Sequence, residues 1–159
     1  MKTIRDVYLD YSATTPLDKR VLDAMMPYLT DVYGNTSSTH RYGRKAEDAV
    51  EIARQKMAHI FNCKPSEIIF TSGGTESDNL AIRGVAWQAQ KMGTGKNHLI
   101  TTPVEHSAVG RTVGQLADFL GFHATILPVD EYAMVDVEEF ANACTDKTVV
   151  ASVIYSNNE

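Results

Sequence analysis

The sequence predicts an α/β fold with a largely parallel sheet, because short apolar runs alternate with helical patterns from residue 68 onward. The composition agrees, since 159 residues with 43% apolar and 22% charged side chains fit one soluble globular domain. A third observation is a turn rich in glycine and hydroxyl side chains, at residues 71–79, between a predicted strand and a predicted helix. Phosphate-binding sites are often built in this way.

The part of the chain before residue 68 is predicted to hold two helices. Asp18 is expected to cap a first helix, which carries an apolar stripe and stops before Pro27. Residues 33–42 are rich in Gly, Asn, Ser and Thr and are predicted to form a loop. The second helix, over 46–61, is the clearest in the chain because its apolar residues recur at three- and four-residue spacing.

The rest of the chain is predicted to alternate strictly between strand and helix. Strands are predicted at 68–70, 98–102, 122–127 and 149–154, and the helices between them end near residues 92, 121 and 143. Parallel strands bring their carboxyl ends to one edge of a sheet, so a ligand site is expected at that edge.

Several classes of partner are disfavoured. The net charge of −5 argues against nucleic acid and against anionic membranes. No apolar run approaches the roughly 20 residues of a membrane span, and the first residues lack the apolar core of a signal peptide. Cys63 and Cys144 follow no metal-binding spacing and are expected to be reduced thiols. A cytoplasmic protein is therefore expected.

The turn from Thr71 to Asn79 has two readings. Its glycine pair lets the backbone approach an anion, and the N–H groups of the following helix start favour negative charge. The same residue types also make an ordinary helix cap. No Gly-Lys-Ser/Thr follows, and the pattern is not Gly-x-Gly-x-x-Gly, so the two familiar nucleotide-binding motifs are absent from this turn.

Polar groups recur just beyond the predicted strand ends. They are the turn at 72–75, His106 after the strand at 98–102, and Asn158 after the strand at 149–154. Each has an ordinary alternative, since His106 can cap a helix and the asparagines can form a turn. Their shared place in one topology favours a common site.

The motifs together resemble the NifS/IscS-type cysteine desulfurases, which are pyridoxal-phosphate (PLP) enzymes of the class V aminotransferase group with fold type I. The resemblance rests on 8–16, on Tyr33-Gly34-Asn35 with Ser38 and His40, on 67–81, on Glu105-His106 and on 157–159, in that order. It covers essentially the whole chain. Residues 1–15 would then be an N-terminal arm, and 16–159 the first half of the large PLP-binding domain, with an incomplete sheet.

The resemblance implies roles for individual residues. Gly74 and Thr75 match the pair that holds the cofactor phosphate, through backbone N–H groups and the threonine hydroxyl. His106 matches the histidine that stacks on the pyridine ring and transfers protons during catalysis. Asn158 matches the asparagine that hydrogen-bonds the phenolic oxygen, and Asn157 is the less favoured of the two.

The implied reaction removes sulfur from L-cysteine to leave L-alanine and an enzyme persulfide. The sulfur then passes to an acceptor protein such as an iron–sulfur scaffold, and the family forms homodimers. Two alternatives stay open. The chain could belong to another class V enzyme, such as a selenocysteine lyase or a small-amino-acid transaminase, or it could be a non-catalytic half-domain that binds a complementary fragment.

The resemblance places further catalytic groups beyond residue 159. These are the Schiff-base lysine, the aspartate that pairs with the pyridine nitrogen, the nucleophilic cysteine and the arginine that holds the substrate carboxylate. We therefore expect negligible desulfurase activity from this chain alone. Release of sulfide from cysteine well above the rate of free PLP would contradict that expectation.

Overall fold

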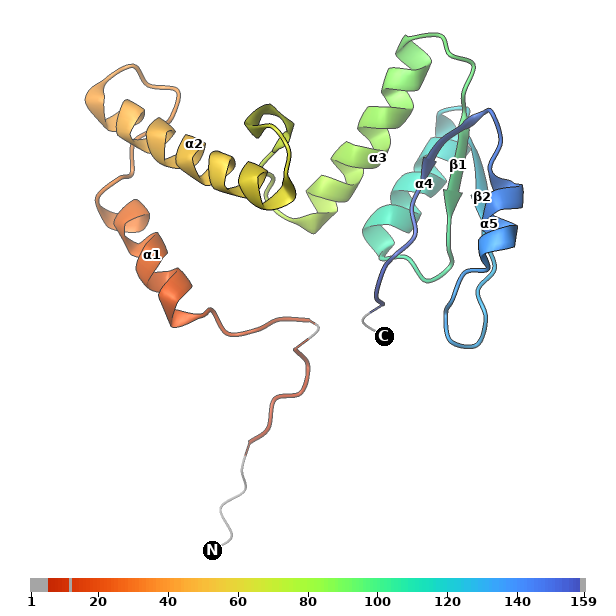
Figure 1. Cartoon of the computed structure of the whole chain (residues 1–159), viewed down its shortest axis with the longest axis horizontal. Helices are drawn as coiled ribbons and strands as arrows, with labels where there is room; N and C mark the ends of the chain where they lie inside the picture. Colours follow the sequence, from red (N-terminus) through yellow and green to blue (C-terminus); the bar gives the residue numbers. More distant parts are fainter. Residues whose placement is uncertain (1–5, 12, 158–159) are drawn as a thin grey trace, which may run out of the picture. The chain divides into compact units, whose positions relative to one another are not determined.

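The chain forms two compact units, one up to Phe70 and one from Thr71 onward. The structure, a computed structural model, describes residues 6–11 and 13–157 (Figure 1). The helices are α1 (Lys19–Thr30), α2 (Arg41–Phe61), the short 3-10 helix η1 (Pro65–Glu67), α3 (Gly74–Lys91), α4 (Ser107–Phe119) and α5 (Val137–Ala143). The strands are β1 (His98–Thr101), β2 (His123–Ile126) and β3 (Thr148–Ala151).

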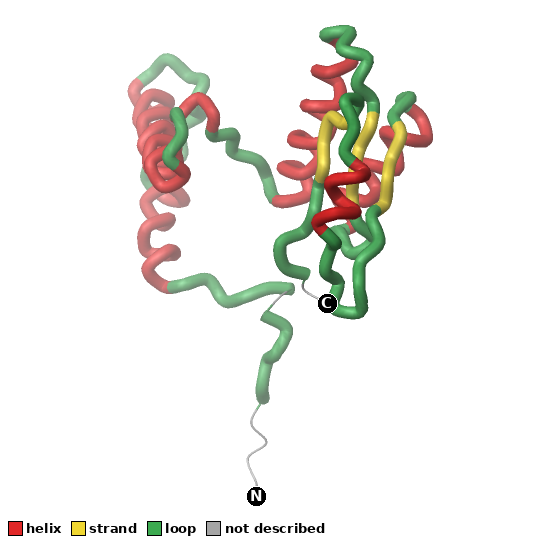
Figure 2. Tube along the Cα trace, turned by 45° about the vertical axis from the view of Figure 1, so that its right-hand side comes forward, coloured by secondary structure: helices red, strands yellow, loops and turns green. Residues whose placement is uncertain are grey.

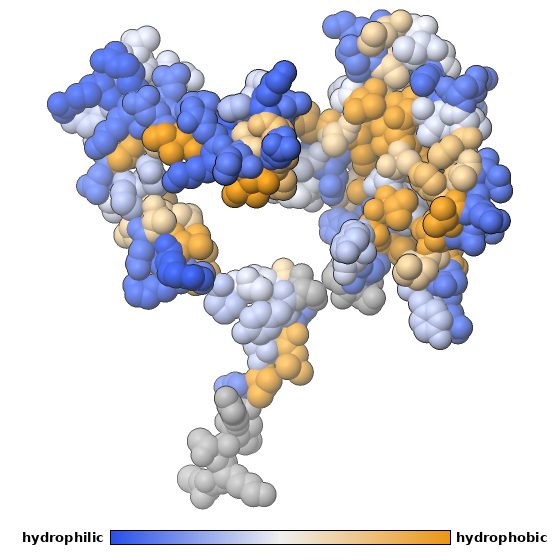
Figure 3. Space-filling view, in the orientation of Figure 1, coloured by the Kyte–Doolittle hydropathy of each residue, from blue (hydrophilic) through white to orange (hydrophobic). Residues whose placement is uncertain are grey.

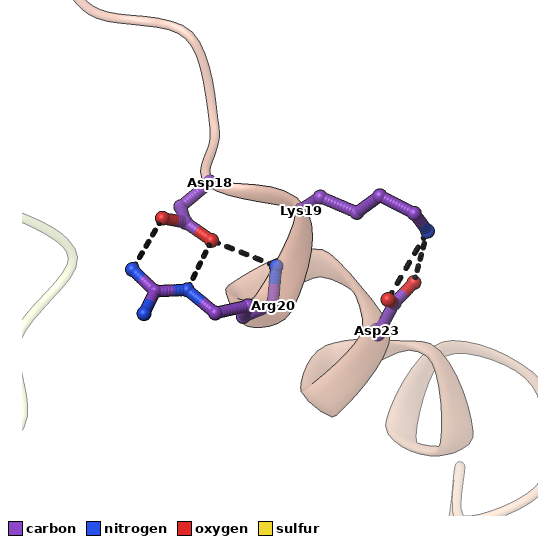
Figure 4. A network of polar contacts seen from close by, with 4 residues as sticks. All are labelled: Asp18, Lys19, Arg20 and Asp23. Atoms are coloured by element: carbon purple, nitrogen blue, oxygen red, sulfur yellow. Dashed lines mark hydrogen bonds and ion pairs between the residues drawn. The ribbon is translucent and has the colours of Figure 1, made fainter.

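Helix α1 begins as the sequence predicts. The Asp18 carboxylate accepts a hydrogen bond from the Arg20 backbone N–H at 2.8 Å and forms an ion pair with the Arg20 guanidinium at 2.7 Å (Figure 4). Lys19 and Asp23 pair at 3.0 Å on the next turn of the same helix. The Arg20 hydrogen bonds are the main cause that lowers the pKa of Asp18.

The predicted stop of this helix before Pro27 is wrong, because α1 continues through Pro27 to Thr30. A proline in the last turn removes only its own N–H from the helical ladder. Its carbonyl still accepts hydrogen bonds from the backbone N–H groups of Asp31 at 2.9 Å and Val32 at 2.8 Å. The helix therefore ends beyond the proline.

The predicted strand at 68–70 is also wrong. Ile68 is extended, but within the described residues the segment at 68–70 pairs with no strand. The Arg54 guanidinium of α2 donates to the Ile68 carbonyl and lies 5.0 Å from the centre of the Phe70 ring. The Ile68 carbonyl thus accepts a hydrogen bond from a side chain, where in a sheet it would accept one from the backbone of a neighbouring strand.

The second unit holds a three-stranded sheet in the order β2-β1-β3, and β1 pairs in parallel with both neighbours. This confirms the predicted α/β class. Helices α3 and α4 pack against each other and against the same face of the sheet. Leu99 from β1, Leu116 from α4 and Ala86 from α3 are each 0% exposed in the core between them.

The topology gathers several loops at one edge of the sheet. The carboxyl ends of the parallel strands lie at the same end of the second unit as the beginnings of α3 and α4, which is the lower end in Figures 1 and 2. The ladder between β1 and β3 is continued once past Ala151, where the Ser152 N–H donates to the Ile100 carbonyl at 2.9 Å. Strand β3 itself is shorter than the predicted 149–154.

Apolar side chains remain exposed in both units. In the second unit they gather over α3 and the neighbouring strand (Figure 3), and exposed apolar residues of α3 include Leu80, Val85 and Trp87. In the first unit Val21 and Met25 of α1 are exposed in the same way. Surfaces of this kind are typical of places where other chain segments or partners bind. None of the helices that the structure describes is long and apolar enough to cross a membrane.

Candidate functional site

The first turn of α3 presents free backbone donors. Gly73 precedes the helix in an extended conformation and supplies no side-chain cap. The first backbone bond of the helix runs from the Ser77 N–H to the Gly73 carbonyl at 3.1 Å. The N–H groups of Gly74, Thr75 and Glu76 have no acceptor in the described part of the chain. Such donors, together with the helix dipole, attract an anion.

No described atom lies close to the Cβ positions of the two glycines in this turn. A Cβ atom added at Gly73 or at Gly74 would meet nothing within 4 Å. Neither glycine is therefore required by the packing of the described residues.

Hydrogen bonds between hydroxyl and carboxylate side chains of the turn itself fix its shape. Glu76 accepts hydrogen bonds from the Ser72 hydroxyl at 2.6 Å and the Ser72 N–H at 2.7 Å. Both bonds lower the pKa of Glu76, and the bond from the Ser72 hydroxyl has the larger effect. The hydroxyls of Thr71 and Ser77 lie 2.6 Å apart and close the turn on its other side. The Glu76 carboxylate is thereby engaged with Ser72.

Helix α3 is held to α4 by a buried polar contact. The Thr112 hydroxyl, in a residue 2% exposed, donates to the Asn79 side-chain carbonyl at 2.7 Å. Arg83 donates to the same Asn79 oxygen at 2.9 Å and also to Gln115. This network fixes the start of α3 relative to α4, whose own start carries His106.

His106 is the N-cap of α4. Its Nδ1 accepts a hydrogen bond from the Ala108 N–H at 3.1 Å. A ring nitrogen that accepts carries no proton, so in the neutral ring the proton lies on Nε2. The imidazole is exposed and borders a cavity of ≈ 560 Å³ at the carboxyl edge of the sheet.

Asn157 also lines this cavity. The Asn157 side-chain amide donates to the Val104 carbonyl at 2.8 Å, which ties the segment after β3 to the loop after β1. The structure thus brings His106 and Asn157 to one cavity. Asn158, the residue for which we predict a cofactor contact, lies outside the described residues.

Gly74 and Thr75 do not line that cavity. They begin α3, whose start lies at the same end of the second unit as the start of α4. The structure does not test the roles predicted for Gly74, Thr75 and His106, but it places all three at the edge where a ligand is expected.

Glu105 belongs to the Glu105-His106 motif, but the sequence predicts no role for its side chain. It lines the cavity beside His106 and is half-buried. Burial is the main cause that raises its pKa, and the charge of Asp78 adds to the rise. Hydrogen bonds from the Ile154 backbone N–H and the Ser152 hydroxyl oppose it. One carboxylate oxygen, Oε1, is buried without a hydrogen-bond partner in the described chain.

The remaining candidates play local roles. His40 caps α2, its Nδ1 accepting from the Gly43 N–H at 3.2 Å. Cys63 is half-buried, Cys144 is exposed, and both are free thiols. Among the described residues no cluster of His, Cys, Asp and Glu is arranged to hold a metal ion.

Comparison with known proteins decides the family. Residues 7–159 match the sequence profile of the aminotransferase class-V family. This chain belongs to that family. The match spans both units and every motif on which the resemblance rests, from the segment at 8–16 to the asparagine pair.

The class-V relatives include enzymes named cysteine desulfurase IscS. The one from Clostridium botulinum is 45% identical over 155 residues, and the alignment covers 98% of this chain and 38% of the relative. The one from Neisseria meningitidis is 50% identical over 154 residues, covering 96% of this chain and 37% of the relative. The chain thus spans little more than a third of the length of these relatives.

Solved structures agree in fold. A NifS-like protein superposes with a TM-score of 0.88 at 40% identity, covering 96% of this chain and 41% of that one. SspA in complex with cysteine superposes with a TM-score of 0.85 at 37% identity, covering 96% of this chain and 43% of that one. The three-stranded parallel sheet and its flanking helices thus match part of a larger desulfurase-type fold.

Proposed function

We propose that this chain is part of a cysteine desulfurase, and that its second unit supplies the phosphate clamp and the ring-facing histidine of a PLP site. The observation that carries the proposal is the first turn of α3. There, backbone N–H groups have no acceptor among the described residues, and a Cβ atom at either glycine would meet nothing within 4 Å, in a chain whose relatives are named cysteine desulfurases. Desulfurase activity, the cysteine substrate and the sulfur acceptor belong to the proposal, because the chain covers 38% of such a relative.

The residues present fit the phosphate of the cofactor. A phosphate at this turn would accept from the N–H groups of Gly74 and Thr75, and from the Thr75 hydroxyl. The nearest carboxylate, Glu76, already accepts from the Ser72 N–H and hydroxyl. Those bonds hold it within the turn.

The residues of the cavity fit the ring of the cofactor. His106 offers a flat, exposed imidazole whose position is fixed through Nδ1, which leaves Nε2 to hold or move a proton. We propose that Asn158 binds the phenolic oxygen and that Asn157 supports the wall of the cavity through its bond to Val104. When bound, PLP supplies an electron sink for the carbon beside the substrate amine.

A pair of substitutions at Gly74 tests the clamp. Gly74 is the first residue of α3, where proline is tolerated, and the extended Gly73 before it suits a following proline. Gly74→Pro therefore removes one N–H and keeps the helix start. Gly74→Ala keeps the N–H and adds a methyl group in open space, so it is the matched control.

We expect Gly74→Pro to weaken PLP binding about tenfold or more, since a hydrogen bond to a charged group is worth roughly 1.5–3 kcal/mol. Gly74→Ala should bind within about threefold of the wild type, which is well under 1 kcal/mol. Equilibrium dialysis, followed by the absorbance of PLP, measures both affinities. Equal affinities of the two variants for PLP would contradict a phosphate clamp that uses the Gly74 N–H.

A further inference from the structure

Asn79 joins three hydrogen-bond partners near the start of α3. Its side-chain NH2 group donates to the Thr75 carbonyl at 2.8 Å. Its side-chain oxygen accepts from the Thr112 hydroxyl at 2.7 Å and from the Arg83 guanidinium at 2.9 Å. Thr112 belongs to α4 and is 2% exposed, so the bond between the two helices is buried. One side chain thus ties the first turn of α3 to α4.

These three bonds require a carboxamide at Asn79. The Arg83 guanidinium only donates and the Thr75 carbonyl only accepts, so the side chain between them must offer both an acceptor and a donor. A carboxylate offers no donor, and an aliphatic side chain offers neither. Asparagine is also a weaker helix former than alanine, and this one lies inside α3. The hydrogen bonds therefore give a reason for the asparagine that helix propensity does not give.

The bond to the Thr75 carbonyl bears on the proposed phosphate clamp. That carbonyl and the Glu76 N–H belong to one planar trans peptide, in which the two groups point in opposite directions. The Glu76 N–H is one of the donors without an acceptor in the described part of the chain. A bond that holds the carbonyl therefore also fixes the direction of this N–H at the start of the helix.

We propose that Asn79 is a positioning residue, whose carboxamide anchors the first turn of α3 on Thr112 and so fixes the backbone donors of the proposed clamp. The inference rests on the proposed function, because it concerns the phosphate side of that same site. Asn79 touches neither substrate nor cofactor in this role. It acts through the peptide between Thr75 and Glu76.

The role predicts an effect on the phosphate of the cofactor and not on its ring. PLP and pyridoxal, its analogue without the phosphate, share the ring, so the ratio of their affinities reports the clamp. Asn79→Ala should lower the affinity for PLP relative to pyridoxal about fivefold, as loss of a hydrogen bond implies. Gln90→Ala is the matched control and should leave the ratio unchanged. Gln90 donates to the Leu120 carbonyl at 2.8 Å and so ties the same two helices at their other ends.

The deciding experiment measures amide hydrogen exchange of Ser77 in the 159-residue chain without cofactor. The Ser77 N–H makes the first backbone bond of α3, to the Gly73 carbonyl at 3.1 Å, so its exchange reports opening of the first turn. We expect Asn79→Ala to speed this exchange about fivefold, because the anchor on Thr112 is lost. Without a positioning role the sign reverses, since alanine favours the helix and would slow the exchange. Gln90→Ala should leave the exchange of Ser77 unchanged.

Exchange at Leu116, in the core, reports whether a variant still folds. If Asn79→Ala also loses protection there, Thr112→Val decides, because it removes the buried donor and keeps a side chain of nearly the same shape. It should speed Ser77 exchange about threefold.

Ser77 exchange that is unchanged or slower in the deciding variant overturns the proposal. An unchanged affinity ratio in Asn79→Ala does the same, when the wild-type chain prefers PLP to pyridoxal. A wild-type chain that binds PLP no tighter than pyridoxal contradicts the proposed function only, since the exchange measurement still decides the role of Asn79.

Discussion

His106 serves the fold as well as the proposed site, because its ring nitrogen caps α4. The two roles that the sequence suggests for His106, a helix cap and a site residue, are therefore compatible. The cap uses Nδ1 and leaves Nε2 free for chemistry. A substitution at this position changes stability and ligand binding together, and the two must be measured separately.

Replacing His106 tests the capping role. His106→Ala should lower the free energy of unfolding of the second unit by about 1 kcal/mol, the usual cost of losing an N-cap. His106→Asn should recover most of that loss, because asparagine is a preferred N-cap residue. Urea unfolding followed by circular dichroism measures both. Equal stability of the two variants would mean that the Nδ1 bond contributes nothing.

The sequence predicts residue types at the site better than it predicts their contacts. Gly74, Thr75 and His106 lie at the carboxyl edge, where the alternation of strands and helices places them. The environment of Glu105 could not be predicted, because Ser152 and Ile154, which act on its pKa, are far away in the sequence. The only signal was a glutamate next to the histidine at a strand end.

At the scale of elements, local signals predict helix ends well. Asp18 begins α1, and the predicted helix over 137–143 matches α5. The prediction fails where pairing decides the outcome. Residues 68–70 carry strand-forming side chains, yet a strand needs a neighbour, and the described residues provide none there.

Two glycines in helices allow a matched test of close packing. A Cβ at Gly43 would lie 2.1 Å from the Ser38 carbonyl oxygen and 2.7 Å from that of Asn35. A Cβ at Gly84 would meet nothing within 4 Å. The loop before α2 therefore folds tightly onto its first turn, while the middle of α3 has free space at Gly84.

Gly43→Ala should destabilise the first unit by roughly 1–3 kcal/mol, the range for overpacking. Gly84→Ala should stabilise α3 by about 0.5–1 kcal/mol, because alanine favours helices over glycine. Hydrogen exchange of amides in α2 and α3 measures each change in its own unit. A neutral Gly43→Ala would show that the loop at 35–38 relaxes easily.

At the scale of the whole molecule, the two units divide the motifs between them. The first holds the segment at 8–16 and the loop with His40, and the second holds the turn at 71–79, His106 and Asn157. Exposed apolar residues on α1 and α3 show that both units leave apolar surface uncovered. The proposed cofactor contacts assigned to Gly74, Thr75 and His106 lie within the second unit.

The most direct test of the central claim compares PLP with pyridoxal as ligands of the wild-type chain. The phosphate clamp predicts that PLP binds about tenfold tighter or more, and that inorganic phosphate competes with PLP but not with pyridoxal. Equilibrium dialysis of the 159-residue chain measures all three ligands. Equal affinities for PLP and pyridoxal, with no competition by phosphate, would contradict a phosphate clamp at the start of α3.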